Sequence, residues 1–140
     1  MKTLKQKVDK SDRIDKLEKE LAKLKKAILE PIKNKWTKIG KLYWMSEVLG
    51  EMNWNEAKEK CKAVGGRLPT RIELMDLYDN HYGECRELIK NDLGWPFYYW
   101  SSTETSGAPT YAWTVYLYNG STNNSTKGTA YRVRCVREKK

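Results

Sequence analysis

The residues that could carry out catalysis or bind a metal are few in this chain. They are three cysteines, one histidine and a pair of serines: Cys61, Cys85, Cys135, His81, Ser101 and Ser102. Zinc sites need several Cys or His ligands at close spacing, and no Cys-x-x-Cys or His-x-x-x-His occurs here. The serines stand in no Gly-x-Ser-x-Gly turn, so we expect them to form structural hydrogen bonds. The sequence therefore predicts no catalytic residue, no metal and no cofactor.

The C-terminal third has instead the composition of a binding surface. From residue 97 to residue 129, strand-like runs alternate with stretches of Tyr, Ser, Thr, Asn and Gly. Tyrosine offers rigid contact area and the small polar residues offer adaptable hydrogen bonds, which is why binding loops use them. The candidate ligand-binding residues are Tyr98, Tyr111, Tyr116, Tyr118, Asn119, Ser121, Asn123 and Asn124.

The net charge of +9 is distributed unevenly along the chain. Residues 1–35 hold 12 Lys or Arg and 6 Asp or Glu, whereas residues 36–140 hold 15 and 12. A nucleic-acid site would place aromatic residues among the basic ones, and no aromatic residue precedes Trp36. We therefore expect a solvated helix surface and no nucleic-acid partner. No apolar run is long enough to span a membrane.

The basic N-terminus is not followed by the apolar region of a secretory signal. This is compatible with a cytoplasmic protein, with a virion component released by lysis, or with a protein that has lost its leader. We expect a place on the virion or the cell surface.

Residues 12–30 are predicted to form a helix with the apolar spacing of a coiled coil. Its a and d positions are Ile14, Leu17, Leu21, Leu24 and Ile28. For parallel helices in register, Arg13 faces Glu18 of the other copy, and Glu20 faces Lys25. Both pairs are opposite in charge, which favours a homo-oligomer through this helix. The alternative is that the helix lies on the globular domain.

Pro31 is expected to end that helix, because proline disfavours helical geometry in the residue before it. Residues 36–140 then form a separate α+β domain. Asn53 and Thr70 each precede a glutamate by three positions, which predicts two capped helices, over 53–64 and 70–80. The other expected elements are one or two strands within 36–45, a short helical piece at 84–91, strands at 97–103, 111–118 and 130–137, and a polar loop at 119–129.

Alternation along the last two strands predicts which side chains enter the core. In the first strand these are Trp113, Val115 and Leu117, while Thr114, Tyr116 and Tyr118 face solvent. In the second strand Tyr131, Val133 and Cys135 lie opposite Arg132 and Arg134, whose side chains would either solubilise the strand or bind an acidic ligand. Further core candidates are Trp54, Trp100, Ile72, Leu74, Met75, Leu77 and Tyr78.

Several ordered pieces of residues 36–138 resemble a C-type lectin-like domain of the bacterial and phage type. They are Trp54 with Cys61, residues 66–70 (GRLPT), 99–103 (YWSST), 112–113 (AW) and 133–137 (VRCVR). The resemblance implies two helices packed on small antiparallel sheets, with a disulfide between Cys61 and Cys135. The family's calcium-binding Glu-Pro-Asn and Gln-Pro-Asp motifs are missing, and Glu104 is the single carboxylate between residues 97 and 130. Because calcium binds roughly six to eight oxygen ligands and this region offers a single carboxylate, we expect no calcium site.

The sequence is also similar to the variable proteins of diversity-generating retroelements, in which adenine mutagenesis yields the residue types found at 98–126. This implies a non-enzymatic protein that binds a protein or glycan on another cell. Two alternatives remain open. One is a surface adhesin domain that is not diversified, and the other is an enzyme of the formylglycine-generating type, which needs a pair of reactive cysteines.

Overall fold

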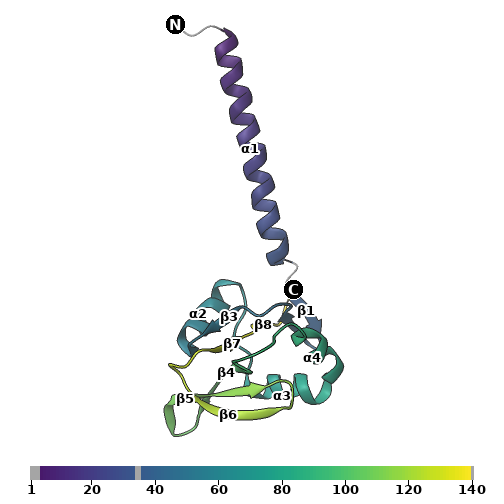
Figure 1. Cartoon of the computed structure of the whole chain (residues 1–140), viewed down its shortest axis with the longest axis vertical. Coiled ribbons are helices and arrows are strands. Elements are labelled where there is room, and N and C mark those ends of the chain that lie inside the picture. Colours follow the sequence, from purple (N-terminus) through teal and green to yellow (C-terminus); the bar gives the residue numbers. More distant parts are fainter. Residues whose placement is uncertain (1–3, 34–35, 140) are drawn as a thin grey trace. The chain divides into compact units, whose positions relative to one another are not determined.

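The computed structural model describes residues 4–33 and 36–139, with side chains for residues 11–27 and 36–139. It divides into two compact units, Met1–Lys35 and Trp36–Lys140. The first unit is a helix, and the second combines helices and sheets (Figure 1).

Helix α1 (Leu4–Lys33) forms the first unit. It begins before the expected residue 12 and continues past Pro31, so the prediction that Pro31 ends the helix is wrong. Proline lacks an N–H and removes one helical hydrogen bond, but its fixed φ is compatible with a helical turn. None of the helices in the described residues is long and apolar enough to cross a membrane.

The apolar stripe of α1 is solvent-exposed. Ile14, Leu17, Leu21 and Leu24 have exposed fractions of 52–64%, and the side chain of Ile28 lies outside the described residues. The coiled coil that the sequence predicts through this stripe stays a prediction.

Two small sheets form the framework of the second unit (Figure 1). The larger has the order β3-β7-β4-β5-β6, and the smaller has the order β1-β2-β8. Neighbouring strands are antiparallel except for β4 and β7, which are parallel. The strands are β1 (Trp36–Ile39), β2 (Leu42–Met45), β3 (Gly50–Met52), β4 (Tyr98–Thr105), β5 (Ala108–Tyr116), β6 (Ser121–Thr126), β7 (Tyr131–Val133) and β8 (Val136–Arg137).

Three helices complete this unit: α2 (Trp54–Ala63), α3 (Arg71–Asn80) and α4 (Tyr82–Ile89). The two predicted caps are confirmed, because the side chain of Asn53 accepts from the Glu56 amide and that of Thr70 from the Glu73 amide. Glu73 also accepts from the Thr70 amide and completes a capping box, which fixes where α3 begins.

Residues of β4 and β5 enter two separate hydrophobic cores. Tyr99 and Val115 belong to the core formed with α3 and α4, while Trp100 and Ala112 belong to the core formed with α2. The first core also holds Ile39, Trp44, Leu74, Leu77, Cys85, Ile89, Leu117 and Val136, and the second holds Met45, Met52, Trp54, Ala57, Cys61, Leu68, Val133 and Cys135. The sheet is therefore buried on both faces at its centre.

This double coverage corrects the predicted burial of two β5 residues. Thr114, expected to face solvent, is fully buried, and its hydroxyl is hydrogen-bonded to the Ser125 hydroxyl at 2.9 Å and donates to the Asn123 carbonyl at 3.2 Å. Trp113, expected in the core, is half-buried beneath the guanidinium of Arg71, whose Cζ lies 4.3 Å from the ring centroid. A buried threonine is tolerated here because both of its hydrogen-bond partners come from β6.

The segment 119–129 is not the long loop that the sequence predicts. Most of it is strand β6, which pairs with β5 from Tyr111↔Thr126 to Tyr116↔Ser121. The strand lies at an edge of the sheet and contains no apolar residue, so it carries no alternating pattern to reveal it. Ile72 is a second correction, because this expected core residue is 75% exposed.

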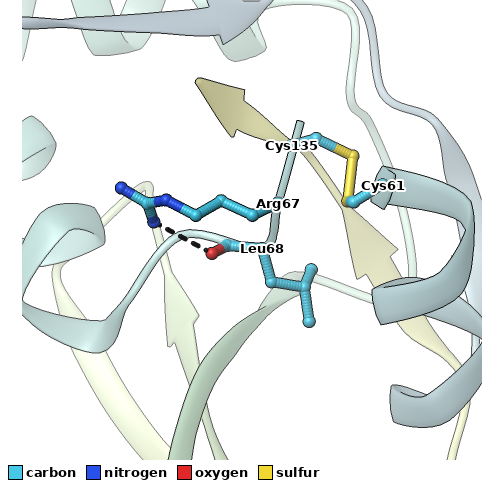
Figure 2. Close-up of a disulfide and its surroundings, with 4 residues drawn as sticks. All are labelled: Cys61, Arg67, Leu68 and Cys135. Atoms are coloured by element: carbon cyan, nitrogen blue, oxygen red, sulfur yellow. Dashed lines mark hydrogen bonds between the residues drawn. A yellow bond between two sulfur atoms is a disulfide. The ribbon is translucent and has the colours of Figure 1, made fainter. Parts of the chain in front are cut away.

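A disulfide joins Cys61 of α2 to Cys135, which lies between β7 and β8, and this confirms the pairing implied by the resemblance. Figure 2 shows it beside Arg67 and Leu68, which follow α2. Arg67 and Val136 exchange two backbone hydrogen bonds of 2.8 and 2.9 Å next to this bridge. Joining residues 74 positions apart restricts the unfolded chain, which for such loops contributes about 2–4 kcal/mol.

Candidate functional site

Six aromatic side chains form a continuous series of ring contacts where β4 begins and β5 ends. We call this series the aromatic row; it consists of Trp95, Phe97, Tyr98, Tyr116, Tyr118 and Tyr131. The centroids of successive rings lie 5.6–6.3 Å apart, in the tilted or edge-on arrangements that aromatic pairs prefer. Trp95 is 69% exposed and Phe97 37% exposed, and the four tyrosines are half-buried. The aromatic row therefore lies at the surface, with its tyrosine rings partly covered by neighbouring side chains.

Strand register sets the spacing within this row. Tyr98 of β4 is paired with Tyr116 of β5, and Tyr116 is paired in turn with Ser121 of β6. Tyr131 of β7 packs edge-on against the buried Trp100 at 5.1 Å and contacts Tyr98 at 6.3 Å. The rings on this side of the sheet are thus carried by three neighbouring strands.

Four of the predicted ligand-binding residues lie on one side of the sheet: Tyr98, Tyr116, Ser121 and Asn123. This follows from the pairs Tyr98↔Tyr116, Tyr116↔Ser121 and Thr114↔Asn123, because side chains of paired residues share a face. Ser121 and Asn123 are exposed. The structure therefore gathers two tyrosine rings, a hydroxyl and an amide on one face, and their role in ligand binding stays a prediction.

Tyr118 and Asn119, also predicted to bind ligand, lie in the turn between β5 and β6. The Tyr118 hydroxyl donates to the Ile89 carbonyl at 3.0 Å, and its ring lies under the Arg86 guanidinium at 5.0 Å, so this tyrosine also fixes the turn to α4. Asn119 is exposed, and its Oδ1 accepts from the Ser121 amide at 2.9 Å.

The last two predicted residues, Tyr111 and Asn124, lie on the other side of the same hairpin. Asn124 is paired with Trp113 rather than with Thr114, and Tyr111 lies two positions before Trp113 on the same face. Both are exposed, and the Asn124 Oδ1 accepts from the Thr105 hydroxyl at 2.7 Å. They do not join the aromatic row.

Three members of the row were not among the predicted residues: Trp95, Phe97 and Tyr131. Trp95 and Phe97 flank Pro96 in the segment between α4 and β4, and the Trp95–Pro96 peptide is cis. Two large aromatic residues beside a glycine and a proline, at the start of the predicted strand 97–103, are the sequence signal that could have marked this segment. Tyr131 carries no such signal, because strand alternation places it on the same face as Val133 and Cys135 and so predicts that it is buried.

A buried polar network holds the segment that carries Trp95. Asp92 is 6% exposed, and its carboxylate receives hydrogen bonds from the Arg134 guanidinium at 2.7 Å and from the Tyr99 hydroxyl. Arg132 donates to the backbone carbonyls of Asp92 at 2.8 Å and of Leu93 at 2.6 Å. The terminal guanidinium nitrogens of Arg132 and Arg134 thus all donate, although the buried Arg134 Nε has no partner, and these hydrogen bonds hold the segment beside β4.

Arg132 and Arg134 were predicted to face solvent or an acidic ligand, and that prediction is wrong. Their exposed fractions are 4% and 1%. Arg134 also donates to the carbonyls of Met45 at 2.6 Å and Leu88 at 3.0 Å.

Burial, and then the hydrogen bond to Asp92, raise the pKa of Tyr99, so its phenol stays protonated and remains a donor.

Gly120 closes the turn from β5 into β6 against α3. Its φ of 75° is one that side chains rarely adopt, and a Cβ there would lie 2.6 Å from the Tyr78 ring. A glycine is therefore required to bring the hairpin onto α3 at this point.

The cysteines offer no reactive pair. Cys61 and Cys135 form the disulfide, and Cys85 is fully buried, where desolvation raises its thiol pKa to about 11. Reactive cysteines need the opposite environment, one that favours the thiolate. In the part of the chain with described side chains, no group of three His, Cys, Asp or Glu residues is placed to hold a metal ion.

Comparison with known proteins identifies the family. The model of the Lcl C-terminal domain family matches residues 38–137, and the chain belongs to this family. Two solved structures with the same fold are botrocetin (13% identity, TM-score 0.57, covering 75% of this chain and 96% of that one) and EMS16 (14% identity, TM-score 0.56, covering 76% and 98%). The expected C-type lectin-like fold is confirmed. No curated protein sequence gives a match.

We predict that Arg134→Met lowers the free energy of unfolding by about 3–5 kcal/mol, because it leaves the Asp92 carboxylate buried without its cation. The control Arg71→Met, which removes a guanidinium stacked on Trp113, should cost about 1 kcal/mol or less. The double variant Arg134→Met with Asp92→Leu should recover most of the loss. Urea denaturation of the four proteins measures these differences. Equal small losses for Arg134→Met and Arg71→Met would contradict the network's role.

Proposed function

We propose that this member of the Lcl C-terminal domain family is a non-enzymatic protein that binds its ligand on the aromatic row and the adjoining face of β6. The observation that carries the proposal is the exposure of aromatic rings beside small polar side chains on one side of the sheet. Rigid rings supply contact area, and Ser121 and Asn123 supply adaptable hydrogen bonds. Exposed aromatic clusters of this kind mark interaction sites on soluble domains.

The architecture supports a surface whose side chains can vary. The groups that hold the hairpin in place are buried: Thr114 and Ser125 between the strands, and Val115 and Leu117 against the helices. The residues that border the aromatic row, such as Ser121 and Asn123, are exposed. Substitution at the exposed positions therefore leaves the folding contacts in place, as a diversity-generating retroelement would require of its variable protein.

The partner we propose is a protein or glycan on another cell. EMS16, which shares the fold, is an antagonist of the collagen receptor integrin α2β1, so the scaffold serves protein recognition in that case. The disulfide is a type of bond that persists in oxidising surroundings. It supports a place on a virion or cell surface, where a receptor-binding protein would act.

We further propose that α1 joins several copies through its exposed stripe. The charge pairs Arg13–Glu18 and Glu20–Lys25 favour parallel, in-register helices of identical chains. Clustering several binding domains would convert weak single contacts into tighter overall attachment.

The display role predicts different tolerance at two sets of positions on the same strands. Randomising Tyr116, Ser121 and Asn123 should leave the domain folded. Substitutions at the exposed Ser121 and Asn123 alter stability by about 0.5 kcal/mol or less each, and the half-buried Tyr116 loses ring contacts worth about 0.5–1.5 kcal/mol each. Randomising the buried pair Thr114 and Ser125 should unfold most variants, since each unsatisfied buried group costs about 1–3 kcal/mol.

Phage display of the two libraries, selected on immobilised hen egg-white lysozyme and on serum albumin, measures the outcome. We expect distinct folded clones for each probe from the first library only. A first library that yields no folded binders would contradict the proposal.

The retroelement itself is tested in the DNA, where a near-copy of the 3′ end differing at adenines should accompany a reverse transcriptase.

Oligomerisation through α1 predicts that Glu20→Lys weakens self-association, because the substitution places two positive charges opposite each other, one at position 20 and one on Lys25 of the other copy. Adding Lys25→Glu should restore the opposite charges and the oligomer. Lys19→Glu, at an outward f position of the same heptad, is the control and should change little. Sedimentation equilibrium of the four proteins measures the association constant. A monomeric parent protein would exclude this role of α1 and favour a helix docked on its own domain.

A further inference from the structure

The segment between α4 and β4 exposes more apolar surface than folding requires. Leu93, Trp95 and Phe97 are three large apolar residues within five positions, and their exposed fractions are 75%, 69% and 37%. Each would gain free energy by burial, and none belongs to either hydrophobic core. Such a concentration of apolar surface marks a contact with something outside the domain.

This segment is held in place although its side chains are exposed. Arg132 fixes the carbonyls of Asp92 and Leu93, and Arg134 and Tyr99 fix the Asp92 carboxylate. A side chain that is presented by a fixed backbone loses little conformational entropy when it binds, which strengthens binding without any new contact. The network is thus placed to pre-organise Trp95 and its neighbours.

The exposed rings are continuous with the candidate binding face. The Trp95 and Phe97 centroids lie 5.7 Å apart, and Phe97 lies 5.7 Å from Tyr116. A ligand that covers Tyr116 therefore reaches Phe97 and then Trp95. Tyr116 thus contacts Phe97 of this segment and is paired with Ser121 of β6.

We propose that Leu93, Trp95 and Phe97 form a fixed apolar anchor of the binding site, which contacts an apolar patch on a protein partner while the hairpin selects among partners. This inference rests on the proposed function and specifies its ligand as a protein surface. The anchor lies outside 98–126, the segment whose composition indicates diversification. It supplies affinity common to all variants, in the manner of the central tryptophans that dominate many protein interfaces.

The chemistry of the segment favours a protein over a sugar or a membrane. Leu93, Trp95 and Phe97 together carry one polar side-chain atom, the indole nitrogen, so they offer little to the hydroxyl groups of a sugar. Residues 91–99 contain no Lys or Arg, whereas segments that bind anionic membrane surfaces are rich in them. An apolar patch on a protein needs neither hydrogen bonds nor basic residues from this segment.

The test uses the full chain with its hairpin selected for a defined probe. Several clones that bind hen egg-white lysozyme are isolated from the library at Tyr116, Ser121 and Asn123. Trp95→Ser is introduced into each clone, and Ile72→Ser is introduced as the matched control, because Ile72 is 75% exposed and lies on α3 outside the aromatic row. Leu93→Ser serves as a second anchor variant, and melting temperatures establish that all variants are folded.

We expect Trp95→Ser to raise the Kd for lysozyme about tenfold or more in most clones, as truncation of a central anchor does. Leu93→Ser should weaken binding in the same clones, and Ile72→Ser should leave the Kd within about twofold. An unchanged Kd for Trp95→Ser in every clone would overturn the anchor while leaving the display function intact. If no clone binds lysozyme, the proposed function fails, and the anchor fails with it.

Two further measurements on the parent protein test whether the anchor binds a membrane or a sugar instead of a protein. Cosedimentation with phosphatidylcholine–phosphatidylserine vesicles, and binding to a glycan array, are each compared between the parent and Trp95→Ser. We expect no Trp95-dependent binding in either assay. Binding to vesicles or glycans that Trp95→Ser abolishes would overturn the assignment of a protein partner.

Discussion

One buried carboxylate fixes the arrangement on which the binding face depends. Asp92 is buried in the segment between α4 and β4, where its carboxylate accepts hydrogen bonds from Arg134 and Tyr99, while Arg132 donates to the adjacent backbone. Burying a charged side chain costs roughly several kcal/mol of desolvation free energy for each ion. Attraction between the charges offsets this cost only where the ion pair has good geometry and further hydrogen bonds satisfy the remaining polar atoms. A displaced 90–97 segment would leave those charges unpaired. We therefore regard the network chiefly as a device that specifies one position for the segment, rather than as a source of net stability.

The sheet separates folding from recognition along its length. At its centre, alternating residues of β4 and β5 enter two cores, one beneath α3 and α4 and the other beneath α2. At the end where β4 begins, no helix covers Tyr98 and Tyr116 fully, and their rings remain half-exposed. The same pleat that buries Trp100 and Ala112 thus presents Tyr98 and Tyr116. This geometry explains how one hairpin can carry both structural and variable positions.

Local signals made part of this structure predictable from sequence. The caps at Asn53 and Thr70 and the stripe on α1 depend on residues a few positions apart, and the structure contains them. The fold and the disulfide followed from ordered motifs that resemble a known family. The placement of Tyr116 on the face opposite Val115 followed from strand alternation, which is also a local property. The shared face of Tyr98, Tyr116, Ser121 and Asn123 became clear only from the strand pairing.

The remainder depended on partners distant in the sequence. The sequence pattern predicts that Arg132 and Arg134 are solvent-exposed. They are buried because they hydrogen-bond to Asp92, about 40 positions earlier in the chain. Thr114 looks exposed until Ser125 is seen to bond it across the hairpin. Strand β6 has no apolar residue and becomes a strand through its pairing with β5. Trp95 precedes the predicted strand 97–103 and Phe97 is its first residue, so strand alternation did not mark the two as neighbouring surface rings.

Amide hydrogen exchange followed by NMR tests the central claim most directly, namely that the buried framework is independent of the displayed side chains. The comparison is between the parent chain and a variant with alanine at Tyr116, Ser121 and Asn123. The account predicts that the amides of β4 and β7 exchange at the same rates in both proteins, because their protection comes from the two cores and the Asp92 network. Faster exchange throughout β4 and β7 in the variant would show that the displayed residues hold the framework together, and would contradict the account.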